Sequence, residues 1–249
     1  MLGDPQNATA WSDGDSPESE LVSVSGSELN VAPQFVALAG IDSPELFRGV
    51  RLYASGGVMP TLGFEIDIAK LGDPRGFVYP KQADENEAYP ESAIDGTGIR
   101  TSAQIEPLAF AANLGVSFSR QIGDHRFDFR PSVGYFRYTV TTEGVQLRAI
   151  KPDLVDPFVR EITLQDGRTD SFSAVGPAFE LGVDLGPKGM FKPTVFIDAS
   201  FYHVLGDRVI DLSDSGSDSF GTEVAHWTVM VNPWIYRLGM GLRVAWIGD

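Results

Sequence analysis

The stretch Leu108-Ala-Phe-Ala-Ala-Asn-Leu-Gly-Val-Ser-Phe-Ser119 decides the fold class of this chain. Its large apolar residues occupy every second position, and alanine, asparagine, glycine and serine stand between them. Successive side chains of a β-strand point to opposite faces, so this order gives one apolar face and one face of small or polar residues. A helix, with its period of 3.6 residues, would mix the two sets. The stretch therefore predicts a β-strand.

The same alternation recurs along the chain from about residue 47. At the C-terminus an aromatic and aliphatic face that runs from Trp234 to Trp246 stands opposite Arg237, Gly239 and Arg243. Segments with the same pattern are 47–55, 61–70, 126–140, 172–185 and 191–206. Turn-forming Gly, Pro, Asp and Ser separate them, which is typical of antiparallel strands. A soluble β-sandwich would show this alternation too, with its apolar faces in the core.

The polar faces of these segments favour a membrane barrel over a sandwich. They carry six bases and six acids: Arg51, Arg126, Arg130, Lys192, Arg237, Arg243, Glu65, Asp67, Asp128, Glu180, Asp184 and Asp198. The whole chain has a net charge of -15, so a water-facing surface has no reason to be neutral. Charges enclosed in a narrow lumen, by contrast, must pair because an unpaired buried charge is costly. We expect a charge network inside the barrel, with Arg237 and Arg243 each facing an acid.

Aromatic residues of the last segment give a second indication of a membrane. Trp234 and Trp246 bracket it, and Tyr236 lies on the same face. At about 3.3 Å per residue and a tilt near 40°, the two tryptophans stand roughly 30 Å apart along the membrane normal. Outer-membrane barrels carry such aromatic girdles at both interfaces. We therefore expect Trp234, Tyr236 and Trp246 to belong to the membrane girdle.

The connections between the segments set the strand count. They alternate between short and long: Gly56–Val58, 71–104, Gly123–Asp124, 146–170, 186–189 and 207–232. Short turns on one rim and long loops on the other are the pattern of bacterial outer-membrane barrels. A barrel with both ends on one side needs an even number of strands, so a first strand is expected around Ala32–Ala39. The predicted fold is an all-β, eight-stranded antiparallel transmembrane barrel over residues 32–249.

Composition limits the remaining possibilities. Residues 1–31 hold six acids and no Lys or Arg, the composition of a disordered segment. The excess of acids argues against nucleic acid as a partner. No run of about 18 apolar residues predicts a membrane-spanning helix, and the mean hydropathy of -0.05 is compatible with strands that face lipid on one side only. Residues after Met1 lack the features of a secretory signal, so for an outer-membrane protein we expect that one was removed or not included.

The inward-facing positions become apolar towards the long-loop end. In segment 126–140 the alternate positions that face inward include Phe136, Tyr138 and Val140. Steps of two residues backwards from the inward positions of the last segment give Val231, Val229 and Trp227. These six residues are candidates for a ligand channel, since small apolar ligands favour pockets with few polar groups. A bulge near Gly134 or Pro233 would instead turn them towards lipid or loops.

Three short motifs resemble strands of the OmpW family of outer-membrane proteins. They are Phe129-Arg-Pro131 with Val133 and Gly134; Ser173, Ala174 and Gly176 with Gly182-Val-Asp184; and Asn232-Pro-Trp234 with Gly239 and Gly241. The resemblance covers residues 105–247. The family commonly ends on an aromatic residue, whereas Ile247-Gly-Asp follows Trp246 here. The resemblance implies an eight-stranded barrel that forms a narrow route for small apolar molecules.

Catalytic and metal-binding patterns are weak. The three histidines, His125, His203 and His226, show no spacing that suggests a catalytic triad, although the last two could approach each other on neighbouring strands. A calcium-like loop that starts at Asp211 has Thr222 at its twelfth position, where an acid is required. We expect no enzyme activity, no cofactor and no metal.

Two functions remain open from the sequence. One is an outer-membrane barrel that binds or passes small hydrophobic molecules through a narrow lumen. The other is a structural or adhesive barrel with a closed, charged lumen, whose extracellular loops bind partners. Outer-membrane lipid and lipopolysaccharide are the expected surroundings in both cases.

Overall fold

The chain forms β-strands and no helix in the part that the computed structural model describes, which is residues 5–14, 22–29, 35–63, 65–71, 96–150, 160–186, 191–218 and 221–246. The strands are β1 (Pro5–Gly14), β2 (Val22–Leu29), β3 (Ala37–Asp42), β4 (Val50–Pro60), β5 (Glu65–Leu71), β6 (Gly96–Ile105), β7 (Leu108–Ile122), β8 (His125–Ile150), β9 (Arg160–Asp184), β10 (Phe191–Leu205), β11 (Val209–Asp218), β12 (Gly221–Met230) and β13 (Trp234–Trp246). These residues contain no helix long and apolar enough to cross a membrane.

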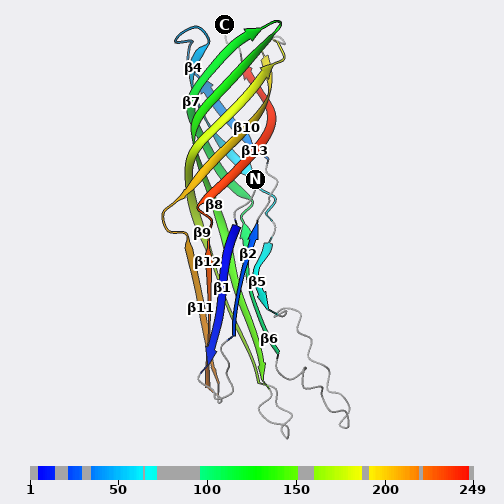
Figure 1. Cartoon of the computed structure of the whole chain (residues 1–249), viewed down its shortest axis with the longest axis vertical. Helices are drawn as coiled ribbons and strands as arrows, with labels where there is room; N and C mark the ends of the chain where they lie inside the picture. Colours follow the sequence, from blue (N-terminus) through cyan, green and yellow to red (C-terminus); the bar gives the residue numbers. More distant parts are fainter. Residues whose placement is uncertain are drawn as a thin grey trace, which may run out of the picture.

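The main sheet curls into a half-barrel at the end of the molecule that holds the C-terminus (Figure 1). Its strand order is β13-β10-β9-β8-β7-β4-β3, and each neighbouring pair is antiparallel. Strands β8 and β9, with 26 and 25 residues, continue beyond the other five strands. We call this curled part, up to about Phe136 on β8, the half-barrel, and the part beyond it the extension.

The extension surrounds a core of its own. It contains β5 and β6, which continue the main sheet from β8, and a second sheet with the order β11-β12-β1-β2. Strand β11 meets β9 through two carboxylates: Asp214 accepts a hydrogen bond from the backbone N–H of Gln165 at 2.9 Å, and Asp166 accepts one from Ser213 at 3.0 Å. Strand β2 contacts β5 on the other side. The extension is therefore a second β-structure built on the long ends of β8 and β9.

The register of the central strands is constant. Strands β8 and β9 pair without a shift from Phe127 opposite Val183 to Ile150 opposite Arg160. The bulge considered near Gly134 is absent from this ladder. Val231 and Ile235, on either side of Pro233, are both buried, so the inward parity also continues from β12 into β13. Side chains at alternate positions therefore face one interior through both parts of the molecule.

Several expectations from the sequence are confirmed. The chain is all-β, and its strands are antiparallel. The quoted stretch lies in β7, the C-terminal segment is β13, and Gly123-Asp124 forms the tight turn between β7 and β8. The strand expected around Ala32–Ala39 is β3, a few residues later in the chain.

The predicted turn at Gly56–Val58 is wrong. Strand β4 runs straight through these residues and pairs with both β3 and β7. A Cβ on Gly57 would lie 2.0 Å from the carbonyl oxygen of Ala37, so glycine lets two backbones approach closely here. As a result β4 covers the length that was assigned to two strands, and residues 61–70 leave the half-barrel.

The long loops and the N-terminal segment also differ from the prediction. The structure places strand residues of the extension in the described parts of the three predicted loops, 71–104, 146–170 and 207–232. Within residues 1–31, which we expected to lack regular structure, residues 5–14 and 22–29 form β1 and β2. Strand β1 pairs with β12 from Asn7 to Gly14, and β2 pairs with β1. The composition of a short segment does not reveal such a partner, because it lies far away in the sequence.

Candidate functional site

The inside of the half-barrel and the inside of the extension have opposite chemistry. Strand β8 keeps its even-numbered side chains inside, and near the turn at Gly123 they are charged: Asp128 and Arg130 are both buried. Further along the same face Phe136, Tyr138 and Val140 are buried. The change occurs without a shift in register, so it results from the sequence of β8 alone.

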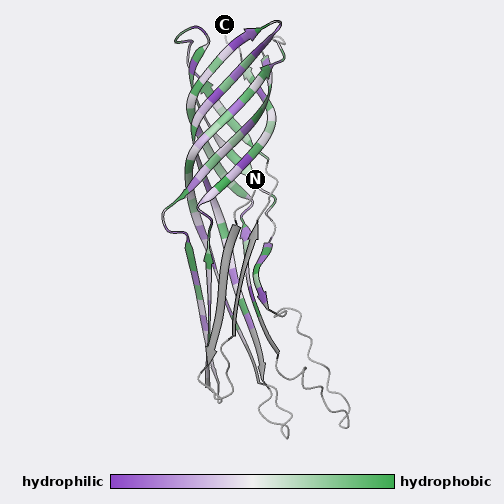
Figure 2. Cartoon of the chain, viewed as in Figure 1, coloured by the Kyte–Doolittle hydropathy of each residue, from purple (hydrophilic) through white to green (hydrophobic). Residues whose placement is uncertain are grey.

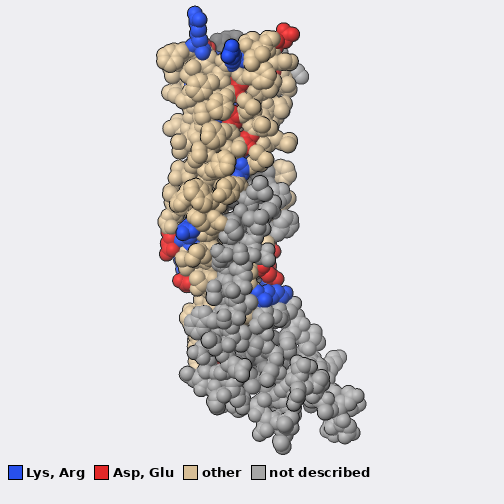
Figure 3. Space-filling view, in the orientation of Figure 1, with Lys and Arg blue, Asp and Glu red and all other residues tan. Residues whose placement is uncertain are grey.

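The outside of the molecule changes in the reverse sense. On the half-barrel, every strand exposes large apolar side chains on its outer face: Ile41, Leu52, Val58, Phe110, Leu114, Phe118, Phe129, Val133, Phe179, Leu181, Val195, Ile197, Phe201, Leu238, Met240, Leu242 and Val244. Figure 2 shows hydrophobic and hydrophilic residues alternating along these ribbons. In Figure 3 the visible surface of this part is mostly uncharged, apart from a short column of acidic side chains with a basic side chain below it and further charges at the end that holds the C-terminus.

The outside of the extension is polar. Hydroxyl side chains of β8 and β9 bond to each other across the ladder, with Thr139 3.1 Å from Ser171 and Thr141 2.9 Å from Thr169. Further along, Gln165 donates to Glu143 at 2.8 Å. A surface of this kind hydrogen-bonds readily to water. An apolar band on one half and a polar surface on the other mark the junction near Phe136 as a boundary between two environments.

A charge network occupies the middle of the half-barrel. The guanidinium of Arg243 on β13 donates to Asp128 on β8 at 2.9 Å and to Glu180 on β9. Arg237 lies 3.3 Å from Asp198 on β10. The pairing of both arginines with inward acids, expected from the sequence, is thus present. Because these residues come from four different strands, the network holds the curled sheet across its interior.

More ion pairs lie towards the short-turn rim. Lys192 pairs with Asp184, and Arg126 lies 3.6 Å from Asp128. Arg130 binds Asp42 of β3, and its guanidinium carbon lies 4.4 Å from the centre of the Tyr53 ring. The rim therefore has fixed partners for its inward cations.

Two residues assigned to the network lie elsewhere, and a third is at its edge. Glu65 and Asp67 are on β5 in the extension, where both bind Arg100. The assignment was wrong because β5 was placed in the barrel wall. Arg51 is at the rim, 3.9 Å from Glu45 and about one-third exposed, which makes it a peripheral member.

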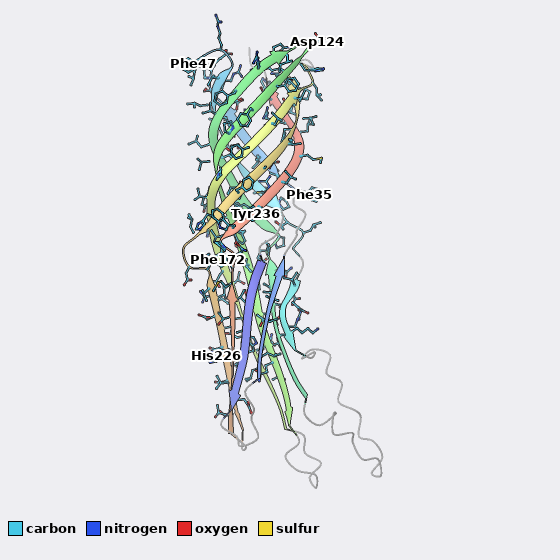
Figure 4. The ribbon with its side chains drawn as sticks, in the orientation of Figure 1. Phe35, Phe47, Asp124, Phe172, His226 and Tyr236 are labelled. Atoms are coloured by element: carbon cyan, nitrogen blue, oxygen red, sulfur yellow. The ribbon has the colours of Figure 1, made fainter. Side chains whose placement is uncertain are left out.

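An aromatic stack fills the interior at the junction. The Phe136 ring lies 5.4 Å from that of Tyr138 and 5.7 Å from that of Tyr202, and Tyr138 lies 5.7 Å from Phe172. These rings come from β8, β9 and β10, and all four are buried. Figure 4 labels Phe172 where the half-barrel meets the extension. The stack separates the charged interior from the apolar interior beyond it.

The extension has an apolar core that contains the rest of the predicted channel residues. Val140, Trp227, Val229 and Val231 are all fully buried, together with Ile210, Leu212 and Ala225 of the second sheet. The indole of Trp227 rests directly on Gly144, where a Cβ would lie 2.2 Å from a ring atom. All six residues proposed for a ligand channel thus face one interior, and side chains pack tightly there.

Buried polar groups stand among these apolar residues. The side-chain amide of Gln146 and the hydroxyls of Thr101 and Thr142 are buried and lack a hydrogen-bond partner among the described residues. All three lie on β6 and β8, which pair with each other. Buried amides and hydroxyls usually bind a protein group or an ordered water. The core of the extension is therefore not purely apolar at this point.

The aromatic side chains expected in a girdle are exposed. Trp234 packs edge-on against His203 at 4.9 Å, Tyr236 against Phe201 at 5.9 Å, and Trp246 against Phe191 at 5.5 Å. They lie at the two ends of β13, on its outer face. His226 lies in the second sheet opposite Ser213, so it is not the neighbour of His203 that the sequence allowed.

Four interior residues were missed. Phe172 and Tyr202 follow the inward parity of β9 and β10, so continuing the alternation would have found them. Asp42 and Tyr53 required knowledge of the strand pairing, since Asp42 lies opposite Tyr53 only through the β3–β4 register.

Comparisons with known proteins identify no family. No protein-family model matches the chain, and a search of curated proteins found no match. The resemblance to the OmpW family therefore stays a prediction from the three motifs.

Proposed function

We propose that the protein is a bacterial outer-membrane β-barrel with a closed interior, which anchors a β-structured extension above the membrane. The observation that carries this proposal is the inversion of polarity along β8 and β9. Both strands face outward with apolar residues in the half-barrel and with hydroxyl and charged residues in the extension, at constant register.

The apolar band favours lipid as its surroundings. Contiguous exposed apolar surfaces of this extent are rare on soluble proteins and mark contact with a membrane or a protein. An inward-facing charge network is the reverse of a soluble sandwich, whose inner faces are apolar. Barrel strands with apolar residues outside and polar residues inside are typical of outer-membrane proteins.

The interior favours an anchor over a conduit. Arg243, Asp128 and Glu180 link three strands across the half-barrel, and the rings of Phe136, Tyr138, Phe172 and Tyr202 stack above them. An eight-stranded barrel is narrow enough for side chains to fill. We therefore expect the extension, with its polar outer face, to make contact with partners at the cell surface.

Binding of small hydrophobic molecules is the second candidate. The apolar interior between Phe136 and Leu212 supports it, since an apolar ligand could displace side chains from this core. In that case an apolar fluorophore such as 1-anilinonaphthalene-8-sulfonate should bind to the folded protein in lipid vesicles. Its binding should weaken several-fold in a Val229→Asp variant, with Thr163→Asp on the exposed side of the extension as the control.

Reconstitution tests the main proposal. The protein should insert into phosphatidylcholine vesicles, migrate differently in gels before and after heating, and show little single-channel conductance. The Phe136→Ala variant should conduct measurably more, because it removes the ring that contacts both tyrosines. A folded monomer in buffer without detergent would refute the membrane location, and large, steady conductance from the parent protein would refute the closed interior.

A further inference from the structure

The half-barrel has two unpaired edges, β3 and β13. No ladder joins these strands among the described residues, and each has one hydrogen-bonded neighbour only, β4 for β3 and β10 for β13. Six antiparallel steps separate them in the strand order, so β3 and β13 run in the same direction. Direct pairing would make one parallel ladder in a half-barrel that is otherwise antiparallel. A single strand between them, antiparallel to both, would raise the number of strands from seven to eight.

The inner face next to β3 is incompletely covered. Leu38 lies opposite Gly57 and Asp42 opposite Tyr53, on the side that faces the interior. Leu38 is nevertheless 43% exposed, whereas Met59, two positions along from Gly57 on the same face, is fully buried. The Asp42 side chain is 37% exposed although it binds Arg130. Interior side chains with this exposure indicate that a neighbouring element is lacking on one side.

The extension shows which strand belongs in the corresponding place. There, β1 lies between β12 and β2 and is antiparallel to both. Strand β12 leads into β13 after three residues, and β2 precedes β3 in the chain. The N-terminal end of β1 pairs with the ends of these two strands that lie nearest the half-barrel, at Pro5 opposite Leu29 and Asn7 opposite Met230. A strand that enters β1 at this end therefore comes from the space between β13 and β3.

We infer that an extended segment leading into β1 occupies the slot between β13 and β3 and closes the barrel as its eighth strand. The inference rests on the membrane location proposed above, because open sheet edges do not occur in lipid, where water cannot satisfy the backbone. The segment needs apolar residues on alternate positions facing lipid. Its inward positions need small or polar residues, since Arg237, Arg243 and Asp42 face the slot's interior side.

The test compares the full chain with a version that carries a designed strand ahead of residue 1. The strand has thirteen residues, the length of β13, with alternating small polar and apolar residues. A control carries the same residues in an order without alternation. Since the chain contains no cysteine, single cysteines can be moved along the added strand and combined with Leu242→Cys on β13, Ile41→Cys on β3, or Val133→Cys on β8 as the distant control.

We expect short-span cross-linking of the alternating strand to Leu242→Cys and to Ile41→Cys, at least ten-fold above its cross-linking to Val133→Cys, and slower unfolding than in the control version. A direct cross-link between Leu242→Cys and Ile41→Cys within one chain would overturn the inference, since the edges would then meet. The same cross-link between two chains would overturn it in favour of a second copy. Vesicle insertion is measured in the same samples: failure to insert refutes the proposed function, whereas insertion without the expected cross-links refutes only the eighth strand.

Discussion

Removal of Arg243 tests whether the half-barrel encloses its charges. In an Arg243→Met variant, Glu180 loses the only salt bridge that the described residues provide for it. Asp128 keeps its hydrogen bond from Ser119, at 2.6 Å, and the more distant Arg126, at 3.6 Å. Breaking a buried ion pair by removing one partner costs about 3–5 kcal/mol. The side chains of Arg243, Asp128 and Glu180 are 20%, 10% and 22% exposed, so water reaches them partly. We therefore expect a loss of about 3 kcal/mol.

The assay is reversible urea unfolding of the parent and the variant in vesicles of the same composition, monitored by tryptophan fluorescence. Arg168→Met is the matched control, since Arg168 pairs with Asp170 at 2.8 Å on the extension but is 59% exposed. An exposed pair contributes at most about 1 kcal/mol. Adding Glu180→Gln to Arg243→Met should recover part of the loss, because the uncompensated charge is then removed.

Two outcomes would refute this reasoning. Equal losses for Arg243→Met and Arg168→Met would show that water screens the interior charges as fully as it screens surface charges. A double variant no more stable than Arg243→Met would show that the loss comes from packing of the arginine stem and not from an unpaired carboxylate.

Two further predictions concern the outer face and the core of the extension. Val133→Arg, in the middle of the apolar band, should destabilise the protein in vesicles by about 2–4 kcal/mol. The control Thr163→Arg, on the exposed side of the extension, should change stability by less than about 0.5 kcal/mol. Similar values for both variants would contradict a lipid-facing band. Gly144→Ala should cost about 1–3 kcal/mol and alter the near-ultraviolet circular dichroism, because the new Cβ would lie 2.2 Å from an atom of the Trp227 ring; an unchanged spectrum would show that the indole does not rest on Gly144.

Local alternation was enough to predict β7, β10 and β13 and the two faces of each. The alternation along β7, β10 and β13 depends only on the order of residues in each strand, so it can be recognised without knowing which strands lie beside them. The same parity predicted that Phe136 and Trp227 face inward and that Arg243 meets an acid. A family resemblance was not required for any of these predictions.

Pairing between strands was decided by the tertiary structure. Gly56 and Gly57 are suited both to a turn and to a close approach of two strands, and only the presence of β3 beside β4 selects the second. That choice moves Glu65 and Asp67 from the lumen to the extension, where Arg100 binds them.

The sequence by itself determined that the chain is all-β and which side of strands such as β7, β10 and β13 is apolar, because alternation repeats along the chain at short range. The tertiary structure alone decided that β1 pairs with β12 and that, among the described residues, no ladder joins β3 to β13. The physical reason is that a backbone hydrogen bond is almost the same for every residue type. Alternation in the sequence therefore predicts that a segment is a strand, and only the folded chain shows which other strands it pairs with.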